Sequence, residues 1–514
     1  MNSSYGITAV AVVFIATLAI GAYGLRFSRT TSDFFVASRS VRPALNASAI
    51  GGEYLSAASF LGVAGLVLAF GTDMLWYPVG WTAGYLILLV LVAAPLRRSG
   101  AYTLPDFAES RLESRSVRRL SSLLVVAIGW LYLMPQFQGA GLSLGTVTGT
   151  DPWVGGALVA TVVLVNVLSG GMRSITFVQA FQYWLKLTAL LVPVMFLLAV
   201  WVGDGATSPA AAEVVSGGVA GDVWASPLTS AGEHPLYTTY SIIVATFLGT
   251  MGLPHVVVRF YTNPDGRAAR RTTLVVLGLL GLFYILPPVY GALGRLYAPD
   301  LIASGRTDAV VLELPSRMIE GLGGELLSAL TTAGAFAAFL STSSGLTIAV
   351  AGVVSQDVLS RRLSGVPAFR AAAVVAVVVP LFLAVVADGV GVARAVGLAF
   401  AVAASTFCPL LVLGIWWRRL TDVGSIAGML VGGALSGIAV VDTLLQNQHS
   451  GWVGSLLAQP AAWTVPSAFA TMIVVSLATQ RRLPANVSRT MVRLHTPEAV
   501  ALDRGPLTSD SADR

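Results

Sequence analysis

The feature that most constrains this chain is a series of long apolar segments that recurs from one end to the other. A helix that crosses a bilayer needs about 20 mostly apolar residues. About thirteen segments reach that length, at residues 5–25, 45–70, 74–96, 120–147, 153–170, 177–202, 238–257, 273–294, 322–355, 371–387, 390–416, 423–443 and 461–479. Only 11% of the 514 residues are charged, against about 25% in soluble domains. The sequence therefore predicts an all-α polytopic membrane protein.

The arginines predict the orientation of this protein in the membrane. All of them lie in every second connection or in the C-terminal tail, except Arg295, Arg306, Arg317 and Arg394. Basic residues collect on the cytoplasmic side, so we expect the N-terminus outside and the C-terminus in the cytoplasm of a bacterial cell. The first segment has no basic region before it and no clear cleavage site, and we interpret it as a retained helix.

Several classes of protein are disfavoured. Cys408 is the only cysteine, which excludes an internal disulfide and a thiolate metal cluster. The chain has no GxxxxGK[ST] loop and no nucleophile, base and acid in a recognisable set, so we predict that it is not an enzyme. The basic residues lie in short loops between apolar segments, which argues against nucleic acid as a partner.

Two of the apolar segments contain helix-breaking residues. Segment 45–70 contains Gly51-Gly52-Glu53-Tyr54-Leu55-Ser56, and segment 238–257 contains Gly249-Thr250-Met251-Gly252-Leu253-Pro254-His255. Proline removes a backbone donor, and unpaired backbone cannot face lipid. The breaks lie five helices apart, which is typical of transporters built from two inverted repeats. The alternative is that these glycines only allow close helix packing.

A third segment, 322–355, places hydroxyl groups in the middle of an apolar helix. Ser341, Thr342, Ser343 and Ser344 follow one another, shortly after Ala338. Hydroxyl and carbonyl oxygens are hard ligands, which suit a group I cation. For a single serine or threonine, a hydrogen bond to its own helix is the simpler interpretation; for the cluster opposite a broken helix, we favour cation binding.

Five strings resemble one family, the sodium:solute symporters, and the resemblance spans about residues 20–480. They are SDFFVASRSVRP, SGAYTLPDFAESRL, LSGGMRSITFVQAF, GGEYLSAASFLGVAGL and GLPHVVVRFYTNPDGRAARR. The last two are similar to the branch of cation/acetate and monocarboxylate symporters in particular. The resemblance implies a leucine-transporter-like fold with a five-plus-five inverted repeat. It divides the chain into an extra N-terminal helix and loop (1–44), a first repeat (45–202), an extracellular loop (203–237), a second repeat (238–416), two accessory helices (417–479) and a cytoplasmic tail (480–514), which turns polar and is expected to be partly disordered.

The resemblance also implies a site for co-transported sodium. Its ligands would be the carbonyls of Gly52, Leu55 and Ala338 and the hydroxyls of Ser341 and Thr342. Some relatives use an aspartate for a second sodium, and here that position is Gln179, which brings no charge.

Two charged residues are expected near the predicted sodium site, inside otherwise apolar segments. Glu53 would add charge near the sodium. Lys186 lies seven residues after Gln179 and therefore on nearly the same helix face. A lysine inside a span is costly; it either pairs with a carboxylate, carries a proton or stands in for a cation, and we favour the pairing.

The substrate is expected where the broken helices meet, because free backbone amides at helix N-termini bind anions. The candidate substrate-binding residues are Tyr54, Ser56, Ala58, Ser59, Gln136, Met251, Gly252 and His255. A satisfied packing histidine is the alternative for His255. For Asp73, a role in an outer gate competes with solvated capping, and loop 203–237 is expected to cover the outer mouth.

These inferences predict a symporter that imports a small organic anion, an acetate-like monocarboxylate, together with sodium by alternating access. Proton coupling, another small solute such as an amino acid or a sugar, and a transporter-like solute sensor remain alternatives. Membrane lipid is the expected surrounding, and a small accessory membrane protein is left open as a partner.

Overall fold

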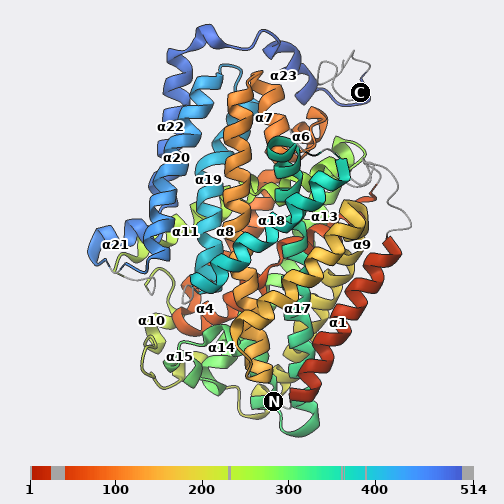
Figure 1. Cartoon of the computed structure of the whole chain (residues 1–514). Coiled ribbons are helices and arrows are strands. Elements are labelled where there is room, and N and C mark those ends of the chain that lie inside the picture. The colour runs from red at the N-terminus through yellow and green to blue at the C-terminus, as the bar shows by residue number, and fades with distance from the viewer. Residues whose placement is uncertain are drawn as a thin grey trace.

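The computed structural model describes residues 3–24, 41–229, 233–360, 363, 365–387, 391–447 and 449–500. Throughout these residues the regular secondary structure is helical (Figure 1), which confirms the predicted all-α class. The described part contains 12 helical stretches that are long and apolar enough to cross a membrane. Sequence analysis predicts about thirteen; the difference arises because the stretch Ala58–Ser99, 42 residues long, joins the end of segment 45–70 to segment 74–96 without a helix-free gap.

The helices have the following bounds. The long ones are α1 (Ser3–Gly24), α8 (Arg115–Thr148), α9 (Pro152–Gly203), α13 (Gly266–Tyr284), α17 (Gly321–Val353), α18 (Gly365–Val386), α19 (Val392–Trp416), α20 (Asp422–Leu444) and α22 (Ala461–Ala478). Shorter ones are η4 (Gly71–Leu75), α5 (Trp76–Ile87), η5 (Leu88–Val92), α6 (Ala93–Ser99), α7 (Leu104–Leu112), η6 (Pro209–Ala211), α10 (Gly221–Ala225), α14 (Leu286–Tyr297), α15 (Asp300–Ala303), η8 (Thr307–Ala309), α16 (Val310–Met318), η9 (Val354–Leu359), α21 (Gly451–Ala458), η10 (Gln480–Arg482) and α23 (Val487–His495). With 52 residues, α9 holds two candidate spans, Pro152–Gly170 and Met172–Gly203.

Both predicted helix breaks are confirmed. The first interrupts a helix between α3 (Pro43–Tyr54) and the π-helix η3 (Ala58–Gly62), which continues into α4 (Val63–Phe70). The second separates α11 (Pro235–Gly252) from α12 (Pro254–Val258), which leads into η7 (Arg259–Thr262). At the second break Leu253 is extended (φ −73, ψ 118), and Pro254 opens the next helix. Proline suits this position because a residue in the first turn has no helical partner for its N–H, and proline has no N–H.

The glycines at the breaks also allow close helix packing. Both interpretations of these glycines, helix breaking and close packing, therefore apply. A Cβ on Gly52 would lie 2.1 Å from the carbonyl oxygen of Gln179 in α9. A Cβ on Gly252 would lie 2.3 Å from the carbonyl oxygen of Ala403 in α19. Each broken helix therefore lies directly against a long unbroken one. The helix α17 packs against α3, α8 and α9. Its most apolar stretch is entirely buried.

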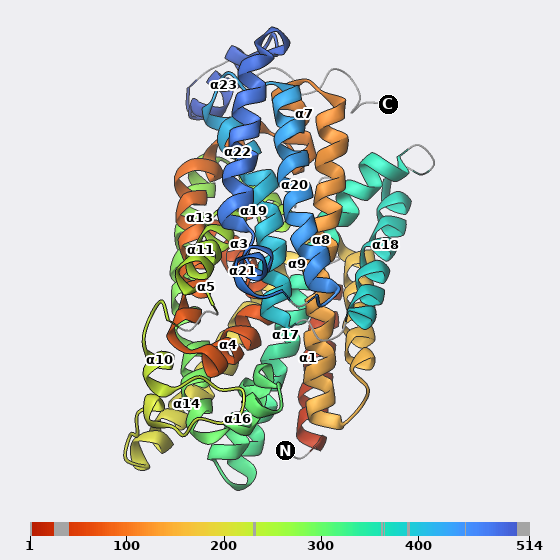
Figure 2. The same cartoon turned by 90° about the vertical axis from the view of Figure 1, so that its left-hand side faces the viewer.

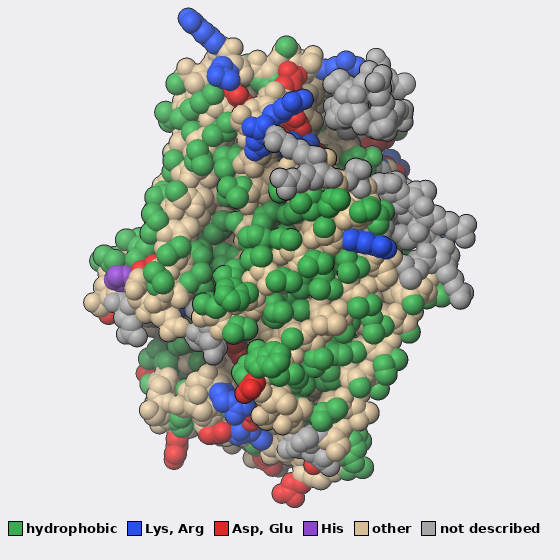
Figure 3. Space-filling model, viewed as in Figure 1, with side chains coloured by type: hydrophobic (Ala, Val, Ile, Leu, Met, Phe, Trp, Pro, Cys, Tyr) green, Lys and Arg blue, Asp and Glu red, His purple; other side chains and the backbone are tan. Residues whose placement is uncertain are grey.

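The two ends of the bundle differ. The start of α1 lies at the same end as α10, α14 and α15, whereas α7 and α23 lie at the opposite end (Figures 1 and 2). Figure 2 shows α20 and α22 side by side on the flank of α19, where all three pack together. Apolar side chains spread over the middle of the face in Figure 3, and charged ones gather towards its ends, as expected of a surface that faces lipid.

The described part of loop 203–237 packs against α4. Trp224 donates its indole N–H to the carbonyl of Val67 at 2.8 Å. Asp73 accepts hydrogen bonds from the backbone of Leu228 and, at 2.9 Å, of Thr229. Because Asp73 is only 1% exposed, its interpretation as a solvated cap is wrong; its carboxylate fastens the loop to the bundle.

The first part of the C-terminal tail contains a helix. Residues Val487–His495 form α23, and Arg98 donates to the carbonyls of Leu494 and His495 and pairs with Glu498 at 3.3 Å. Residues 501–514 lie outside the described residues, as do three arginines of the first predicted cytoplasmic loop, Arg26, Arg29 and Arg39.

Candidate functional site

The centre of the candidate site is the side chain of Lys186, which extends from α9 to the first break. Its Nζ donates hydrogen bonds to the carbonyls of Gly52 and, at 2.7 Å, of Leu55. It donates a third, at 2.8 Å, to the hydroxyl of Ser341 in α17. Three of the five predicted sodium ligands thus surround one ammonium group.

The other two predicted ligands adjoin the same group of atoms. Ser341 donates its hydroxyl to the carbonyl of Ala338 at 3.0 Å. Thr342 donates its hydroxyl to the carbonyl of Glu53 at 2.6 Å, which ties α17 to the last turn of α3. The structure therefore places the five predicted residues together around the break.

The predicted pairing of Lys186 with a carboxylate is wrong. The acidic residue beside it, Glu53, instead pairs with Arg259 of η7, with 2.6 Å between the Glu53 carboxylate and Arg259 Nε. Both side chains are buried, at 2% and 1% exposure. The guanidinium balances the charge that Glu53 was expected to add near the sodium, and Lys186 is left with the neutral oxygens of the break.

Gln179 joins this ion pair to the break. Its side chain donates to the carbonyl of Ser341 at 2.8 Å and accepts a hydrogen bond from Arg259, which also donates to the hydroxyl of Thr176 at 3.0 Å. Gln179 is therefore a bridge between α9, α17 and η7. Arg259 was missed because it lies just beyond a predicted span, where an arginine reads as a loop residue.

The polar residues of the first broken helix connect it to α11 and α13. Tyr54 and Thr250 share a hydrogen bond of 2.9 Å between their hydroxyls. Ser59 and Tyr284 share one of 2.8 Å. Both contacts cross from residues around the first break to helices that follow the outer loop, so the structure brings Tyr54 and Ser59 to the interface where a substrate is expected.

Aromatic rings line this interface. We call them the aromatic cluster: Tyr54, Trp81, Tyr85, Tyr132, Tyr284 and Phe400. Their centroids lie 4.8 Å (Tyr54–Tyr85) to 6.2 Å (Tyr54–Phe400) apart. Apart from Tyr54 they were not predicted, because only the packing of α5, α8, α13 and α19 brings these rings together.

Gln136 has a different role from the predicted one. Its side-chain oxygen accepts the N–H of Ala57 at 3.0 Å, and its amide donates to the carbonyl of Tyr132 at 3.3 Å. Ala57 opens the helix after the first break, so its N–H is the amide that a carboxylate was expected to use. The side-chain oxygen of Gln136 accepts this hydrogen bond in place of a carboxylate and stabilises the break.

The remaining candidates are all buried. Ser56 and Ala58 follow the break, while Met251 and Gly252 end α11. His255 is fully buried, its ring stands edge-on to Tyr132 at 5.2 Å, and neither nitrogen forms a hydrogen bond within the described structure. The interpretation of His255 as a satisfied packing histidine is therefore wrong.

Unpaired buried donors gather around the aromatic cluster. Besides His255, the indole N–H of Trp81 and the hydroxyl of Tyr85 are buried without a hydrogen-bond partner. Such groups are rare because each one loses its hydration without compensation. Their concentration at one place is what a small polar ligand would satisfy.

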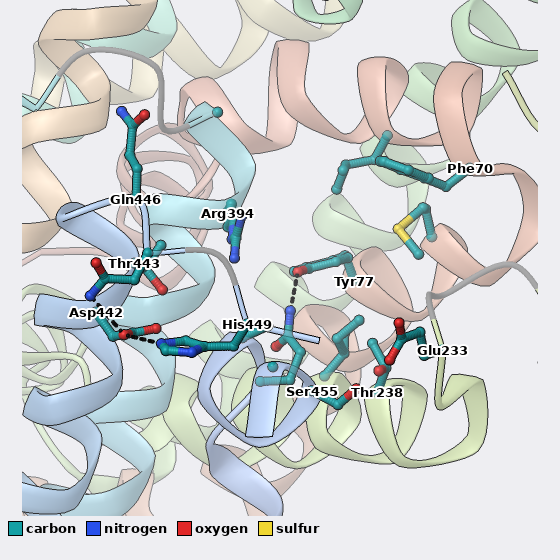
Figure 4. A pocket seen from close by; sticks show the side chains of 18 of the residues that line it. Phe70, Tyr77, Glu233, Thr238, Arg394, Asp442, Thr443, Gln446, His449 and Ser455 are labelled. Carbon is teal, nitrogen blue, oxygen red and sulfur yellow. Dashed lines mark hydrogen bonds and ion pairs between the residues drawn. The ribbon is translucent and has the colours of Figure 1, made fainter. Parts of the chain in front are cut away.

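A cavity of about 680 Å³ lies on the α10 side of the aromatic cluster. Figure 4 shows Arg394 of α19 facing it, with Asp442 and His449 paired at 2.9 Å on its wall. At its inner end Tyr77 accepts a hydrogen bond of 3.4 Å from Gln459. The ring of Tyr77 lies 5.5 Å from that of Trp81, so Tyr77 lies between the cavity and the aromatic cluster.

Comparison with known proteins decides the family. Residues 34–432 match the Sodium:solute symporter family, which is well over half of the chain. The chain belongs to the sodium:solute symporter family. This symporter is 30% identical over 450 residues to YwcA of Bacillus subtilis strain 168, described as an uncharacterized symporter, and the match covers 84% of this chain and 85% of YwcA. Family membership makes sodium the co-transported ion.

Solved structures support the fold of the symporter. A Na⁺-coupled sialic acid symporter in a substrate-bound outward-open state matches with a TM-score of 0.67 and 15% identity, covering 91% of this chain and 98% of that one. A manganese transporter of Eremococcus coleocola matches with a TM-score of 0.52 and 14% identity, covering 86% and 95%. The likeness confirms the predicted leucine-transporter-like fold.

Proposed function

We propose that this symporter imports a small, acetate-like monocarboxylate with sodium across a bacterial plasma membrane, with its N-terminus outside and its C-terminus inside. The observation that carries the proposal is the set of unpaired buried donors among the aromatic rings. An indole N–H, a phenol and an imidazole can each donate to a carboxylate. The closely spaced rings suit a substrate whose apolar part is no larger than one or two carbons.

The proposed route starts in the outer cavity. Arg394 attracts an anion there, and Tyr77 and Trp81 form the barrier that the substrate must pass. A cluster of this size distinguishes acetate from its neighbours only modestly, because one methylene in an apolar pocket changes the binding free energy by about 1–3 kcal/mol. We therefore expect propionate, pyruvate and lactate to compete with acetate to different degrees.

Contacts on the opposite side support alternating access. Arg97 of α6 donates to the carbonyls of Asn263 and Pro264 at 2.5 and 2.6 Å. These bonds join the end of α6 to the segment that follows the second broken helix. In the proposed cycle, the repeats 45–202 and 238–416 rock against one another, and these contacts separate when the inner side opens.

The test is counterflow of labelled acetate in proteoliposomes that contain the purified full-length protein. Wild type should exchange internal unlabelled acetate for external label. Trp81→Phe removes one donor and keeps an aromatic ring, and should raise the half-saturating acetate concentration about 10- to 150-fold, since a hydrogen bond to a charged group contributes about 1.5–3 kcal/mol. Trp130→Phe is the matched control, because Trp130 also has an unpaired buried N–H but lies outside the aromatic cluster.

Equal effects of the two tryptophan variants would contradict the proposed substrate site. Acetate binding without counterflow would favour the alternative of a solute sensor. Counterflow of amino acids or sugars in place of acetate would keep the symporter and replace its substrate.

A further inference from the structure

The position of Lys186 has a consequence for the co-transported ion. Its ammonium contacts Gly52, Leu55 and Ser341, and these are oxygens that the family resemblance assigns to sodium. The side chain is fully buried. Its three hydrogen bonds use the three protons that an ammonium group carries.

The ammonium of Lys186 occupies the position of a cation among the oxygens of this site. Its partners are two backbone carbonyls and one hydroxyl, all neutral acceptors, and it forms no ion pair with Glu53, which Arg259 neutralises. A buried charge is tolerated only where polar groups replace its hydration. Here the oxygens exposed by the break in the first broken helix provide that replacement, as they would for a sodium ion.

We infer that the ammonium of Lys186 is a tethered cation that competes with sodium for this site, so that the two exclude one another there. The inference rests on the sodium site of the proposed function. In the absence of sodium, the lysine joins α9, α17 and the end of α3 through the same oxygens. Sodium then binds only to molecules in which the lysine side chain has moved away.

The structure offers a place for the displaced ammonium. The second carboxylate oxygen of Glu53, Oε1, is buried and accepts no hydrogen bond in the described structure. A Cβ on Gly345 would lie 2.0 Å from this oxygen, so the small residue leaves the carboxylate room in the core. In this inference, Glu53 Oε1 is the acceptor to which the ammonium moves when sodium binds.

Competition predicts a measurable change in sodium affinity. The apparent dissociation constant equals the intrinsic one divided by the fraction of molecules in which the site is free. If the ammonium occupies the site in nine molecules out of ten, its removal tightens sodium binding about tenfold. If it occupies the site more often, the change is larger.

The experiment follows the thermal unfolding of the purified full-length protein in detergent. Sodium chloride is raised against choline chloride at constant ionic strength, and the midpoint of the sodium-dependent rise in Tm is compared among variants. Lys186→Met should lower this midpoint at least about tenfold relative to wild type. Gln182→Met is the matched control: it removes a buried polar group from the same helix, one that bonds Thr17 of α1, and should leave the midpoint unchanged.

A second variant of Lys186 keeps the test decisive. Lys186→Gln, which also lacks the charge, should behave like Lys186→Met, and folding of either variant only when sodium is present would support the inference. A midpoint within twofold of wild type, a loss of the sodium response, or no folded protein for both variants even at high sodium would overturn it. This measurement needs no organic substrate, so failure of acetate transport would not affect it.

Discussion

The buried ion pair between Glu53 and Arg259 gives the most quantitative test of the site. Its atoms are 2.6 Å apart and both side chains are nearly inaccessible. Arg259→Met keeps the apolar stem and removes the charge, which leaves the Glu53 carboxylate buried without its partner. Removal of one member of a buried pair costs about 3–5 kcal/mol. The variant should lose that much free energy of unfolding.

The double variant shows whether the loss comes from the pair. Glu53→Gln combined with Arg259→Met removes both charges, so no ion is left uncompensated. We expect it to be more stable than Arg259→Met alone, and its total loss to be smaller than the sum of the single losses by about 1–3 kcal/mol. The control is Arg306→Met, which breaks an exposed pair with Glu313 of 2.8 Å and should cost less than about 1 kcal/mol.

The assay is reversible unfolding in mixed detergent micelles, with the midpoint converted to a free energy for wild type, Glu53→Gln, Arg259→Met, the double variant and Arg306→Met. Additive losses in the double variant would refute the reasoning, because they would mean that the two charges do not depend on one another. A loss in Arg259→Met no greater than in Arg306→Met would refute it as well.

Three further predictions follow from contacts of the fold. Gly52→Ala should abolish sodium-driven uptake and lower Tm, because its Cβ would meet the backbone carbonyl of Gln179 at 2.1 Å. Gln136→Met should cost about 1–3 kcal/mol by chemical unfolding, since the buried N–H of Ala57 loses its acceptor. Burial raises the pKa of Asp308, which lies in η8 between candidate spans, to about 6. Its contribution to stability is therefore present below about pH 4 and is lost as pH rises through about 6. Asp308→Asn should remove that part of the pH dependence of Tm.

Each of these predictions has a control. Gly278→Ala adds a Cβ that would meet no atom within 4 Å and should leave uptake intact. Thr273→Val removes a buried hydroxyl whose bond stays within its own helix, to Ala269, and is compared with Gln136→Met for the size of its loss. A Tm profile of Asp308→Asn that falls from pH 4 to 7 as steeply as that of wild type would contradict the assignment to Asp308.

The sequence was sufficient to predict features that depend on local chemistry. The spans follow from runs of apolar residues, and Gly252 with Pro254 predicts the second break because neither residue favours a continuous helix. The grouping of Ser341 and Thr342 with the first break came from the family resemblance. The structure places these residues together.

Features that depend on tertiary contacts could not be predicted. Lys186 could have paired with any carboxylate on a neighbouring helix, and only the packing of α9 against α3 shows that its ammonium reaches the break instead. From the sequence, Arg259 is expected in a loop. The structure places it in η7, where it is buried. Gln136 was expected to contact substrate, and its bond to Ala57 depends on how α8 approaches the break.

The central claim is sodium-coupled uptake of a small carboxylate, and one measurement tests it most directly. Accumulation of labelled acetate is followed in proteoliposomes at fixed pH, with and without an inward sodium gradient, for wild type and for the double variant Ser341→Ala/Thr342→Ala. The account predicts accumulation in wild type that requires the sodium gradient and is lost in the double variant. Accumulation that is driven by a pH gradient alone, or that persists unchanged in the double variant, would contradict it.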